Sequence, residues 1–247
     1  MPVLNDITLD EIDLPNSYYG YSATRVENLG ATEYTVATIA CDVSGSTSGF
    51  TSDMEAAITK IVQACKFSPR ADNLLLRFVE FDDALHEIHG FKLLENCHAA
   101  DYAGVLRSGG STALFDATEN VVSATTNYGQ QLSSNDFSAN AILFVITDGC
   151  DNASKLPAKA VKDALKKAIM SEALESIISI LIGVNVQDYQ VSQHLRQFQK
   201  DAGFTQYVEL GDADSKTLAK LAQFVSQSIS AQSQSLGTGS SSQSLVF

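Results

Sequence analysis

Two apolar runs, each ending in oxygen-bearing side chains, constrain this chain more than any other feature of its sequence. The first run, residues 34–41, leads directly into residues 42–46 (DVSGS), and the second, residues 141–146, leads into residues 147–149 (TDG). A run as continuously apolar as the second suits a parallel strand covered by helices on both faces. Ligands of such sheets bind beyond the carboxyl ends of the strands. We therefore expect the two polar segments to meet at one edge of a parallel sheet.

The remainder of the chain alternates strand-like runs with segments in which apolar residues recur at helical spacing. We expect strands at residues 34–41, 73–81, 85–91, 141–147, 177–184 and 205–209, a first helix from about residue 52, and helices at 113–128, 157–170, 189–202 and 215–230. This alternation implies right-handed β-α-β units. The expected fold class is α/β: a Rossmann-like, doubly wound, mostly parallel six-stranded sheet with one antiparallel edge strand (residues 85–91) and helices on both faces.

The length of 247 residues suits one large α/β domain with extensions better than two small domains. We place that domain at residues 34–230. Residues 1–33 carry scattered apolar residues among acidic ones and are expected to form an N-terminal extension that lies on the domain or binds a partner. Residues 231–247 are rich in Ser, Gln and Gly, which is typical of a flexible C-terminal tail.

Asp42, Ser44 and Ser46 occupy alternate positions, so an extended chain directs their side chains to the same side. Hard cations such as Mg²⁺ accept carboxylate and hydroxyl oxygens and keep several positions for water or for a partner's oxygen. Taken alone, the three residues are equally typical of an ordinary turn. Thr112, in a glycine-flexible loop that opens a helix, and Asp148, at the end of an apolar strand, favour a metal site at the same sheet edge.

Together these five residues resemble the metal-ion-dependent adhesion site (MIDAS) of the von Willebrand factor A (VWA) domain family. That family has D-x-S-x-S on a first loop, Thr on a second and Asp on a third, and the matches in order are Asp42, Ser44, Ser46, Thr112 and Asp148. The resemblance covers most of the chain and implies an intact MIDAS. It implies that the hydroxyls bind a divalent cation directly, Mg²⁺ or else Ca²⁺ or Mn²⁺, while the aspartates act directly or through water. It also implies that the cation takes an Asp or Glu carboxylate from a partner protein.

Other polar residues near these segments are expected to have structural roles. Asp116 lies just inside a helix start, where it supports the loop or the helix dipole, and Asp151 is expected to bond its own turn. A stripe of lysines at helical spacing is interpreted as a solvated helix face, with a docking surface as the alternative. It comprises Lys155, Lys159, Lys162 and Lys166.

Composition and patterning disfavour several classes of partner and location. The formal net charge of −13, from 29 acidic and 16 basic side chains, argues against nucleic acid, whose phosphates are bound by clustered Lys and Arg. No apolar stretch reaches the length of a membrane span, and no basic segment followed by an apolar one marks a secretory signal. The four cysteines lack C-x-x-C spacing, which disfavours a zinc site and indicates reduced thiols. These features predict a cytoplasmic protein without a membrane span.

The resemblance implies a non-catalytic module for protein–protein interaction. A stand-alone domain of this kind is similar to cytosolic bacterial VWA proteins, which work beside AAA+ ATPases of the MoxR type or beside the kinases and phosphatases of tellurite-resistance-like systems. The expected role is therefore that of an intracellular adaptor in a bacterial stress, defence or assembly system, with a component of such a system as its partner. The alternative is an adhesin or surface component exported by a non-classical route.

An enzyme is disfavoured by the same segments. A phosphotransferase of the haloacid-dehalogenase type needs a second Asp two residues after its nucleophile, and Ser44 stands there. Residues 45–49 imitate a nucleophile elbow, but the residue at its centre is Thr47 instead of Ser. The chain has no P-loop and no Rossmann glycine fingerprint. We therefore expect no metal-dependent hydrolase or phosphotransferase activity.

Overall fold

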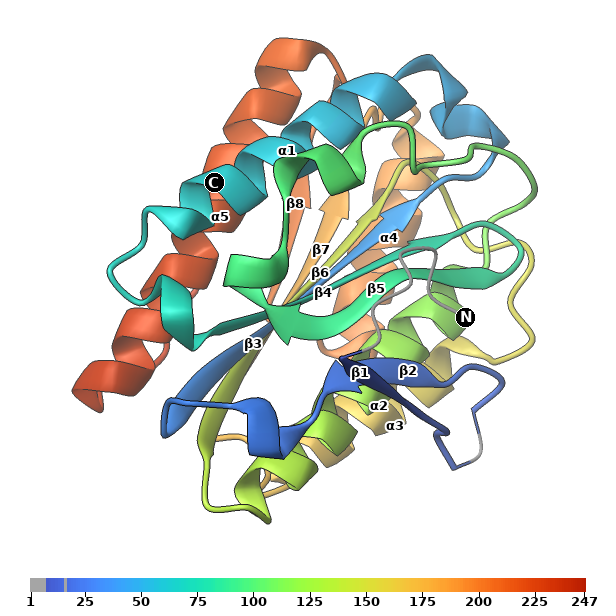
Figure 1. Ribbon diagram of the computed structural model, residues 1–247. Coiled ribbons are helices and arrows are strands. Elements are labelled where there is room, and N and C mark those ends of the chain that lie inside the picture. The colour runs from blue at the N-terminus through green and yellow to red at the C-terminus, as the bar shows by residue number, and fades with distance from the viewer. Residues whose placement is uncertain (1–7, 16) are drawn as a thin grey trace.

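The structure, a computed structural model, describes residues 8–15 and 17–247 and is built on one eight-stranded sheet (Figure 1). The strands are β1 (Leu9–Ile12), β2 (Tyr21–Thr24), β3 (Glu33–Asp42), β4 (Leu74–Phe81), β5 (Leu85–Leu93), β6 (Ser138–Thr147), β7 (Ile177–Gly183) and β8 (Gln206–Glu209). Their order across the sheet is β1-β2-β5-β4-β3-β6-β7-β8. β3 pairs in parallel with β4 and β6, β7 and β8 continue the parallel arrangement, and β5 pairs antiparallel with β4.

Helices cover both faces of this sheet (Figure 1). They are α1 (Thr51–Lys66), α2 (Leu114–Ser133), α3 (Ala158–Met170), α4 (Tyr189–Ala202) and α5 (Ser215–Thr238), with the short 3₁₀ helices η1 (Val26–Asn28), η2 (Gly45–Gly49), η3 (Ala71–Asn73), η4 (Leu94–Asn96) and η5 (Ala99–Tyr102). α1 and α5 pack on one face, and α2, α3 and α4 pack on the other. The predicted α/β class and mostly parallel sheet are thus confirmed. Within the described ranges, every helix is too short or too polar to cross a bilayer.

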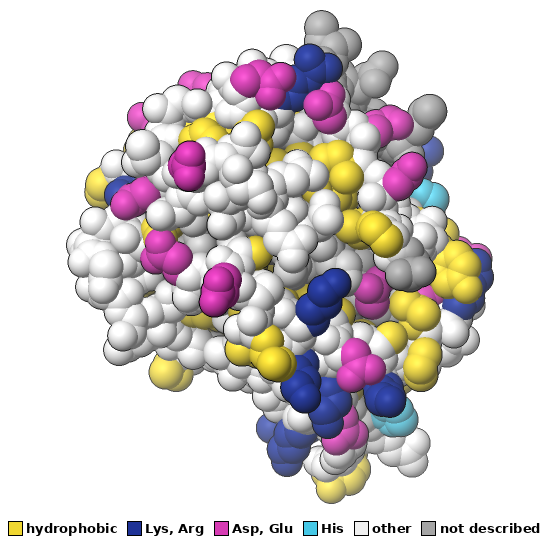
Figure 2. All heavy atoms as spheres, turned by 90° about the horizontal axis from the view of Figure 1, so that it is seen from below, with side chains coloured by type: hydrophobic (Ala, Val, Ile, Leu, Met, Phe, Trp, Pro, Cys, Tyr) yellow, Lys and Arg dark blue, Asp and Glu magenta, His cyan; other side chains and the backbone are white. Residues whose placement is uncertain are grey.

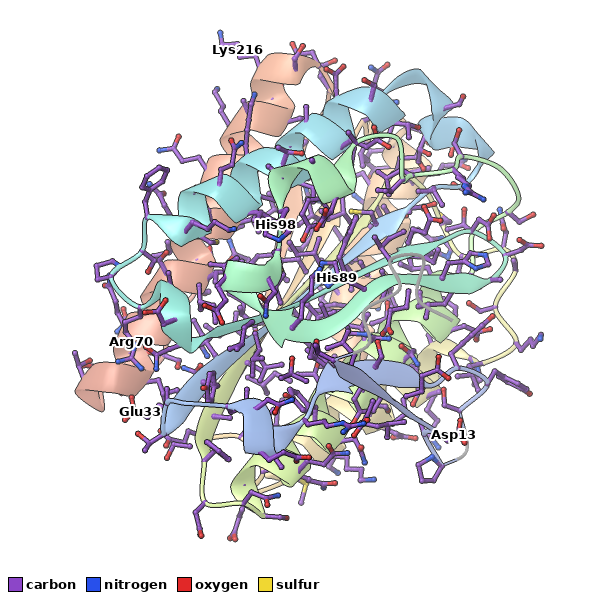
Figure 3. The ribbon with its side chains drawn as sticks, viewed as in Figure 1. Asp13, Glu33, Arg70, His89, His98 and Lys216 are labelled. Atoms are coloured by element: carbon purple, nitrogen blue, oxygen red, sulfur yellow. The ribbon has the colours of Figure 1, made fainter. Side chains whose placement is uncertain are left out.

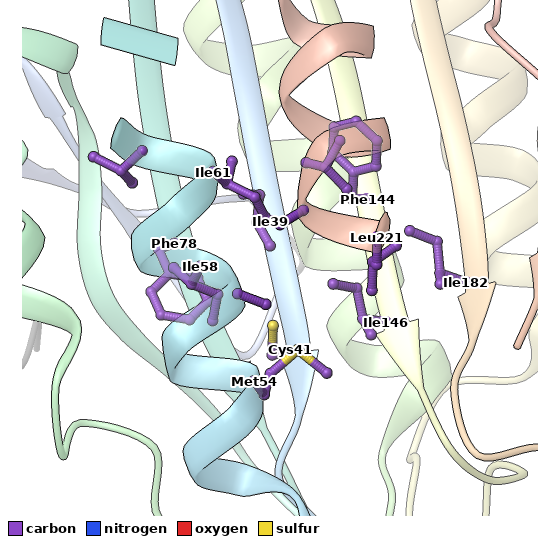
Figure 4. Packing of buried hydrophobic residues seen from close by; sticks show 14 of the residues in the cluster. Ile39, Cys41, Met54, Ile58, Ile61, Phe78, Phe144, Ile146, Ile182 and Leu221 are labelled. Carbon is purple, nitrogen blue, oxygen red and sulfur yellow. The ribbon is translucent and has the colours of Figure 1, made fainter. Parts of the chain in front are cut away.

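The apolar run of β3 is required because the strand is buried on both faces. Its successive side chains alternate: Ile39 and Cys41 join the core on the side of α1 and α5, whereas Ala40 joins the core on the side of α2. Figure 4 shows Ile39 and Cys41 near Met54 and Ile58 of α1. This packing fixes the depth of β3 in the molecule, and therefore the place where its carboxyl end emerges.

The sheet has eight strands instead of the predicted six, because the N-terminal region contributes β1 and β2. These two strands form an antiparallel hairpin, and β2 lies beside β5 in the parallel sense through one residue pair, Ala23 and Phe91. β5 is antiparallel to β4 as predicted, but it is not an edge strand. Strands of four residues are too short to show a clear hydrophobic period, so the sequence pattern missed them. The parts of the predicted N-terminal extension at residues 1–7 and 16 lie outside the described residues.

β2 is held to the sheet mainly by side-chain hydrogen bonds, among them bonds to Glu87, which also forms a buried ion pair with Arg77. The Glu87 carboxylate of β5 accepts hydrogen bonds from Ser22 N (2.9 Å) and Ser22 Oγ (2.6 Å) of β2, and from Arg77 Nε (2.7 Å) of β4. Arg77 is 0% exposed, and its Nη2 also donates to Asn120 Oδ1 of α2 (3.0 Å). β2 passes so close to β5 that a Cβ on Gly90 would collide with the Ser22 carbonyl, so only glycine fits at that crossing.

The last helix is longer than the sequence pattern predicts. α5 extends to Thr238 instead of ending at residue 230, and it includes part of the segment that was predicted to be flexible. Gln232, in that segment, is 1% exposed. Its side-chain Nε2 donates to the main-chain carbonyl of Ala141 (3.1 Å), and its main-chain carbonyl accepts a hydrogen bond from Asn140 Nδ2 (2.8 Å). The hydrophobic pattern did not predict residues 231–238 as helix, because two of their three buried side chains, Gln232 and Ser233, are polar.

Two further contacts hold the C-terminal segment against the domain. Arg70 donates through Nη2 to Glu33 Oε2 (2.8 Å) and through Nε to Ser233 Oγ (3.3 Å). Figure 3 shows Arg70 and Glu33 near each other at one end of the molecule. Phe247 packs edge-on against Phe224 of α5, with ring centroids 5.4 Å apart. The C-terminal residues therefore contribute to the packing of the α1–α5 layer.

Glu87→Ala should strongly destabilise the protein, because it leaves the buried Arg77 without its ion-pair partner. We expect a loss of about 3 kcal/mol or more in the free energy of unfolding, measured by urea denaturation. The double variant Arg77→Met/Glu87→Leu should recover part of the loss, since it buries no charge but still leaves Ser22 N and Oγ without their acceptor. As a control, Arg196→Ala removes a partner that is 49% exposed and should cost about 1 kcal/mol or less. A loss in Glu87→Ala as small as that of the control would contradict this role.

Truncation of residues 231–247 should lower the Tm by about 5–10 °C, because it removes buried side chains that bond to β6. Differential scanning calorimetry measures the shift. Truncation of residues 240–247 alone is the matched control and should cost less, since it keeps Gln232 in place. An unchanged Tm after the longer truncation would show that the segment does not stabilise the fold.

Candidate metal centre

Three loops meet at the carboxyl edge of the central strands, and main-chain hydrogen bonds tie the first two together. Gly45 N, after β3, donates to the Gly110 carbonyl (3.2 Å), and Gly109 N donates to the Val43 carbonyl (2.8 Å). Gly110 has a φ of +66°, and a Cβ there would lie 3.0 Å from a carboxylate oxygen of Asp82. Because this backbone conformation and this crowding both disfavour a side chain, the second loop needs glycine at this position.

Four of the five predicted metal ligands form one hydrogen-bonded group. Asp42, the last residue of β3, accepts a hydrogen bond at Oδ1 from Ser44 N (2.8 Å). The hydroxyl oxygens of Ser44 and Ser46 lie 3.2 Å apart, and Ser46 Oγ donates to Asp148 Oδ1 (2.9 Å). Asp148 directly follows β6, the neighbour of β3, so adjacent strand ends bring these residues together. Asp42 and Ser44 are buried and Ser46 is exposed, so the group reaches the surface.

Thr112, the fifth predicted ligand, makes no hydrogen bond to these four residues and is tied through its main chain to the third loop. Its N–H donates to Asn152 Oδ1 (2.7 Å), and its carbonyl accepts hydrogen bonds from the N–H groups of Asn152 (2.9 Å) and Ala153 (3.1 Å). The hydroxyl of Thr112 makes no hydrogen bond within the described part of the chain, and the residue is 5% exposed. The loop therefore presents a hydroxyl whose position is fixed by two neighbouring residues. The sequence did not single out Asn152.

Thr147 is a further residue of the site that the sequence did not single out. Its Oγ1 donates to Asp42 Oδ2 (2.6 Å) and accepts a hydrogen bond from Gly149 N (3.2 Å). Both carboxylate oxygens of Asp42 therefore receive a donor, which orients this carboxylate between the ends of β3 and β6. The available signal was a polar residue that closes an otherwise apolar strand.

The two carboxylates of the site, Asp42 and Asp148, have no cationic partner among the residues that the structure describes. Burial raises the pKa of Asp42 to about 6, although hydrogen bonds from Thr147 and Ser44 favour the ionised form. Burial also raises the pKa of Asp148. None of the ion pairs among the described residues includes either aspartate. A divalent cation at this place would offset the cost of burying these charges.

The spacing of the oxygens fits neighbouring ligands of a small divalent cation. Ligands at adjacent corners of an octahedron with bonds of about 2.1 Å lie about 3 Å apart. The oxygen separations of 3.2 Å for Ser44–Ser46 and 2.9 Å for Ser46–Asp148 match that spacing. No cluster of three or more His, Cys, Asp or Glu side chains that could hold a metal occurs in the residues described. A cation held here therefore depends on the Ser and Thr hydroxyls.

Asp116 and Asp151 fasten the third loop to the start of α2. Asp116 accepts a hydrogen bond from Leu156 N (2.8 Å), in agreement with its predicted support of a loop. Asp151 accepts a hydrogen bond from Ser154 Oγ within its own turn, as predicted, and another from Phe115 N (3.2 Å). These bonds couple the loop after β6 to the helix that follows the predicted threonine ligand.

No protein-family model matches the chain, and no curated protein matches it in sequence. Solved structures match its fold. The PilB minor pilin from Streptococcus sanguinis has a TM-score of 0.57 at 14% identity, with 88% of this chain and 66% of the pilin chain covered. The open conformation of the pilus adhesin SpaC from Lactobacillus rhamnosus GG has a TM-score of 0.57 at 12% identity, with 91% of this chain and 33% of the adhesin covered.

A third match is the proximal thread matrix protein 1 (PTMP1) from the mussel byssus with a zinc-occupied MIDAS motif. Its TM-score is 0.53 at 16% identity, with 81% of this chain and 46% of the PTMP1 chain covered. The present chain thus spans about two thirds of the pilin and less than half of the other two proteins. At these identities the likeness shows a shared fold. In PTMP1 that fold carries an occupied MIDAS.

Asp42→Asn should raise the Tm of the metal-free protein at about pH 7.5 and abolish its stabilisation by added Mg²⁺. The pKa of Asp42 is about 6 in the folded state, compared with about 4 in an unfolded chain. Between these pH values the folded state binds more protons, so the metal-free stability falls as pH rises from about 4 to 6. Asn does not ionise, so the gap between variant and wild type should close as pH falls to about 4.

Thermal denaturation in EDTA between about pH 4 and 8, repeated in Mg²⁺, measures both effects. Asp72→Asn changes an exposed carboxylate away from the three loops and serves as the control. It should keep the pH profile and the Mg²⁺ response of the wild type. If Asp42→Asn and the wild type had the same profile, the buried carboxylate would not be the source of the pH dependence.

Proposed function

We propose that this chain is a non-catalytic interaction module of the VWA type, which binds a carboxylate of a partner protein through a divalent cation. The residues that hold the cation are Asp42, Ser44, Ser46, Thr112 and Asp148. We propose Mg²⁺ as the physiological ion, with Ca²⁺ or Mn²⁺ as substitutes, because hard cations of this kind accept hydroxyl and carboxylate oxygens.

One observation carries the proposal. A row of hydroxyl and carboxylate oxygens runs from the buried Asp42 and Ser44 to the exposed Ser46 and on to Asp148. The hydroxyl oxygens of Ser44 and Ser46 lie 3.2 Å apart, and Ser46 Oγ lies 2.9 Å from Asp148 Oδ1. The row lies beyond the carboxyl ends of the two central strands, where sheets of this class bind their ligands. Exposure at Ser46 leaves one side of the row open to a partner.

The chemistry of these ligands favours an acidic partner. The three hydroxyls are neutral, so within the site only Asp42 and Asp148 could balance the charge of a divalent cation. Asp42 already receives hydrogen bonds at both of its oxygens, and Asp148 receives one from Ser46, so both can orient the loops without direct contact with the ion. Aspartates that act through water would leave the cation electrophilic, and an Asp or Glu carboxylate from a partner would then complete its coordination.

We further propose an intracellular adaptor role, with a partner drawn from an AAA+ ATPase system or from a kinase and phosphatase system. This part rests on analogy with cytosolic bacterial members of the VWA family and not on any residue of this chain.

The fold shared with the PilB minor pilin and the SpaC adhesin favours a second candidate, a surface adhesin or pilus component. The same metal site would then bind a carboxylate outside the cell. Fractionation of native cells separates the two candidates, because recovery with the cell envelope would favour the adhesin.

We propose no catalytic role for the site. Thr47 stands at the centre of the segment that imitates a nucleophile elbow, and it is 2% exposed. Its hydroxyl donates to the Ser44 carbonyl (2.9 Å), so it is engaged in the turn and does not face an incoming substrate. This arrangement supports a binding module over a hydrolase.

Thr112→Ala should weaken Mg²⁺ binding about tenfold or more, because it removes one of three hydroxyl ligands without touching the core. Isothermal titration calorimetry measures the affinity. The variant should keep the wild-type Tm in EDTA, and it should lose the proteins that the wild type captures from native cells in Mg²⁺ but not in EDTA.

Two controls accompany this variant. Thr112→Ser keeps a hydroxyl and should retain most of the affinity, while Ser48→Ala removes an exposed hydroxyl of the first loop and should have no effect. Equal Mg²⁺ affinity in Thr112→Ala and wild type would remove this residue from the ligand set.

A further inference from the structure

A surface cleft of about 570 Å³ lies between α4 and the starts of α2 and α3. Phe115 of α2 and Phe198 of α4 line it and contact each other, with ring centroids 4.9 Å apart. Tyr189, at the start of α4, also lines the cleft and is 75% exposed. The rim is polar and includes Gln197, which donates to Asp201 Oδ1 (2.9 Å). Aromatic rings surrounded by polar groups suit an apolar side chain of a bound peptide.

The cleft begins beside the candidate metal site. Phe115 is three residues beyond Thr112, and its N–H donates to Ser154 Oγ (3.0 Å) in the loop that follows Asp148. Ala158, at the start of α3, lines the cleft from the end of the same loop. A peptide whose carboxylate reaches the cation therefore has the cleft within a few residues of extended chain.

The described lining of the cleft contains Asp201 and no lysine or arginine, but the exposed face of α3 beyond Ala158 carries lysines, although the chain as a whole has a net charge of −13. Lys162 stands one turn beyond Ala158 and continues the same side of the helix, with Lys159 and Lys166 on the adjoining outer face. All three lysines are exposed, and none belongs to an ion pair among the residues described. Asp163 is the one acidic residue of α3.

Figure 2 views the molecule from the side on which α2 and α3 lie in Figure 1. Lys and Arg side chains gather toward one end of this face, next to hydrophobic side chains and with some Asp and Glu side chains among them, while further Asp and Glu are spread over the rest of it (Figure 2).

We propose that this cleft and the α3 lysines bind an acidic segment of the partner protein, in which an apolar or aromatic residue lies close to the carboxylates. The apolar side chain packs on Phe115 and Phe198. The flanking carboxylates lie against the three lysines, while one further carboxylate binds the cation. We infer an acidic occupant from charge complementarity. This chain is strongly acidic as a whole, so an acidic segment of a partner is attracted only to a surface such as that of α3, where lysines have no acidic partner among the residues described. This inference rests on the proposed function and adds a second anchor to it.

The test selects peptides from a random dodecapeptide display library on the immobilised full-length chain, once in Mg²⁺ and once in EDTA. We expect the peptides enriched in Mg²⁺ to contain Asp or Glu together with an apolar or aromatic residue. Selected peptides are then labelled and titrated into variants. The triple variant Lys159→Glu/Lys162→Glu/Lys166→Glu should weaken binding by about tenfold or more, and Tyr189→Ala should weaken it about threefold or more.

Matched controls lie on other elements. Lys60→Glu/Lys216→Glu/Lys220→Glu makes the same change in net charge at exposed positions of α1 and α5, which cover the opposite face of the sheet. Phe67→Ala removes an aromatic side chain that is 89% exposed. Both controls should bind the peptides as the wild type does, and the Tm of each variant verifies that it folds.

The outcomes separate the cleft from the metal site. Metal-dependent binding that the triple variant and its control leave equally strong would overturn the cleft proposal and support the proposed function. Binding that persists in EDTA and is weakened only by the cleft variants would support the cleft and contradict the metal role. Failure to enrich acidic peptides under either condition would overturn the cleft proposal.

Discussion

The hydrogen bond from Thr147 to Asp42 joins the ends of β3 and β6, the bond from Ser44 fixes the turn that follows Asp42, and the geometry of the candidate metal centre depends on both. Asp42 closes a strand whose preceding residues are buried on both faces, so the packing of the sheet sets the depth of its carboxylate. Ser44 and Ser46 are then placed by a turn that begins at this fixed point. A site built on strand ends in this way holds its ligands more rigidly than loops alone would allow.

The burial of Asp42 and Asp148 lowers the stability of the metal-free protein, although the proposed function needs them. Burial of Asp42, with Asp148 nearby and neither paired with a cationic side chain among the described residues, disfavours the metal-free folded state at neutral pH. The two helical layers and the C-terminal turn of α5 supply stability elsewhere in the molecule. Residues that keep a site ready for a ligand commonly reduce the stability of the empty protein in this manner. A bound cation would turn the same carboxylates from an unfavourable element of the fold into a favourable one.

The sequence predicted the central parallel strands, the helices and the meeting of the two polar segments, because each of these depends on local pattern. A strand buried on both faces excludes polar residues, so the first oxygen-bearing residue marks its end, as at Asp42 and Asp148. Asn152 escaped prediction, because its role depends on which loops become neighbours. The sequence also did not predict the hairpin of β1 and β2 or the C-terminal part of α5, because both are held by contacts between residues far apart in the chain. Their anchors, Glu87 and Gln232, are polar side chains whose partners lie far away in the sequence.

The attachment of β2 has a consequence for how the molecule fluctuates. β2 shares one residue pair with β5 and is otherwise held to the domain by side-chain hydrogen bonds, among them those of Glu87 and Tyr128, whereas β3 is paired along its length with both neighbours. Regions with few ladder bonds open at lower free energy than a fully paired core. We therefore expect the N-terminal hairpin to open more readily than the parallel strands, so that its amide protons exchange with solvent while those of the parallel strands stay protected.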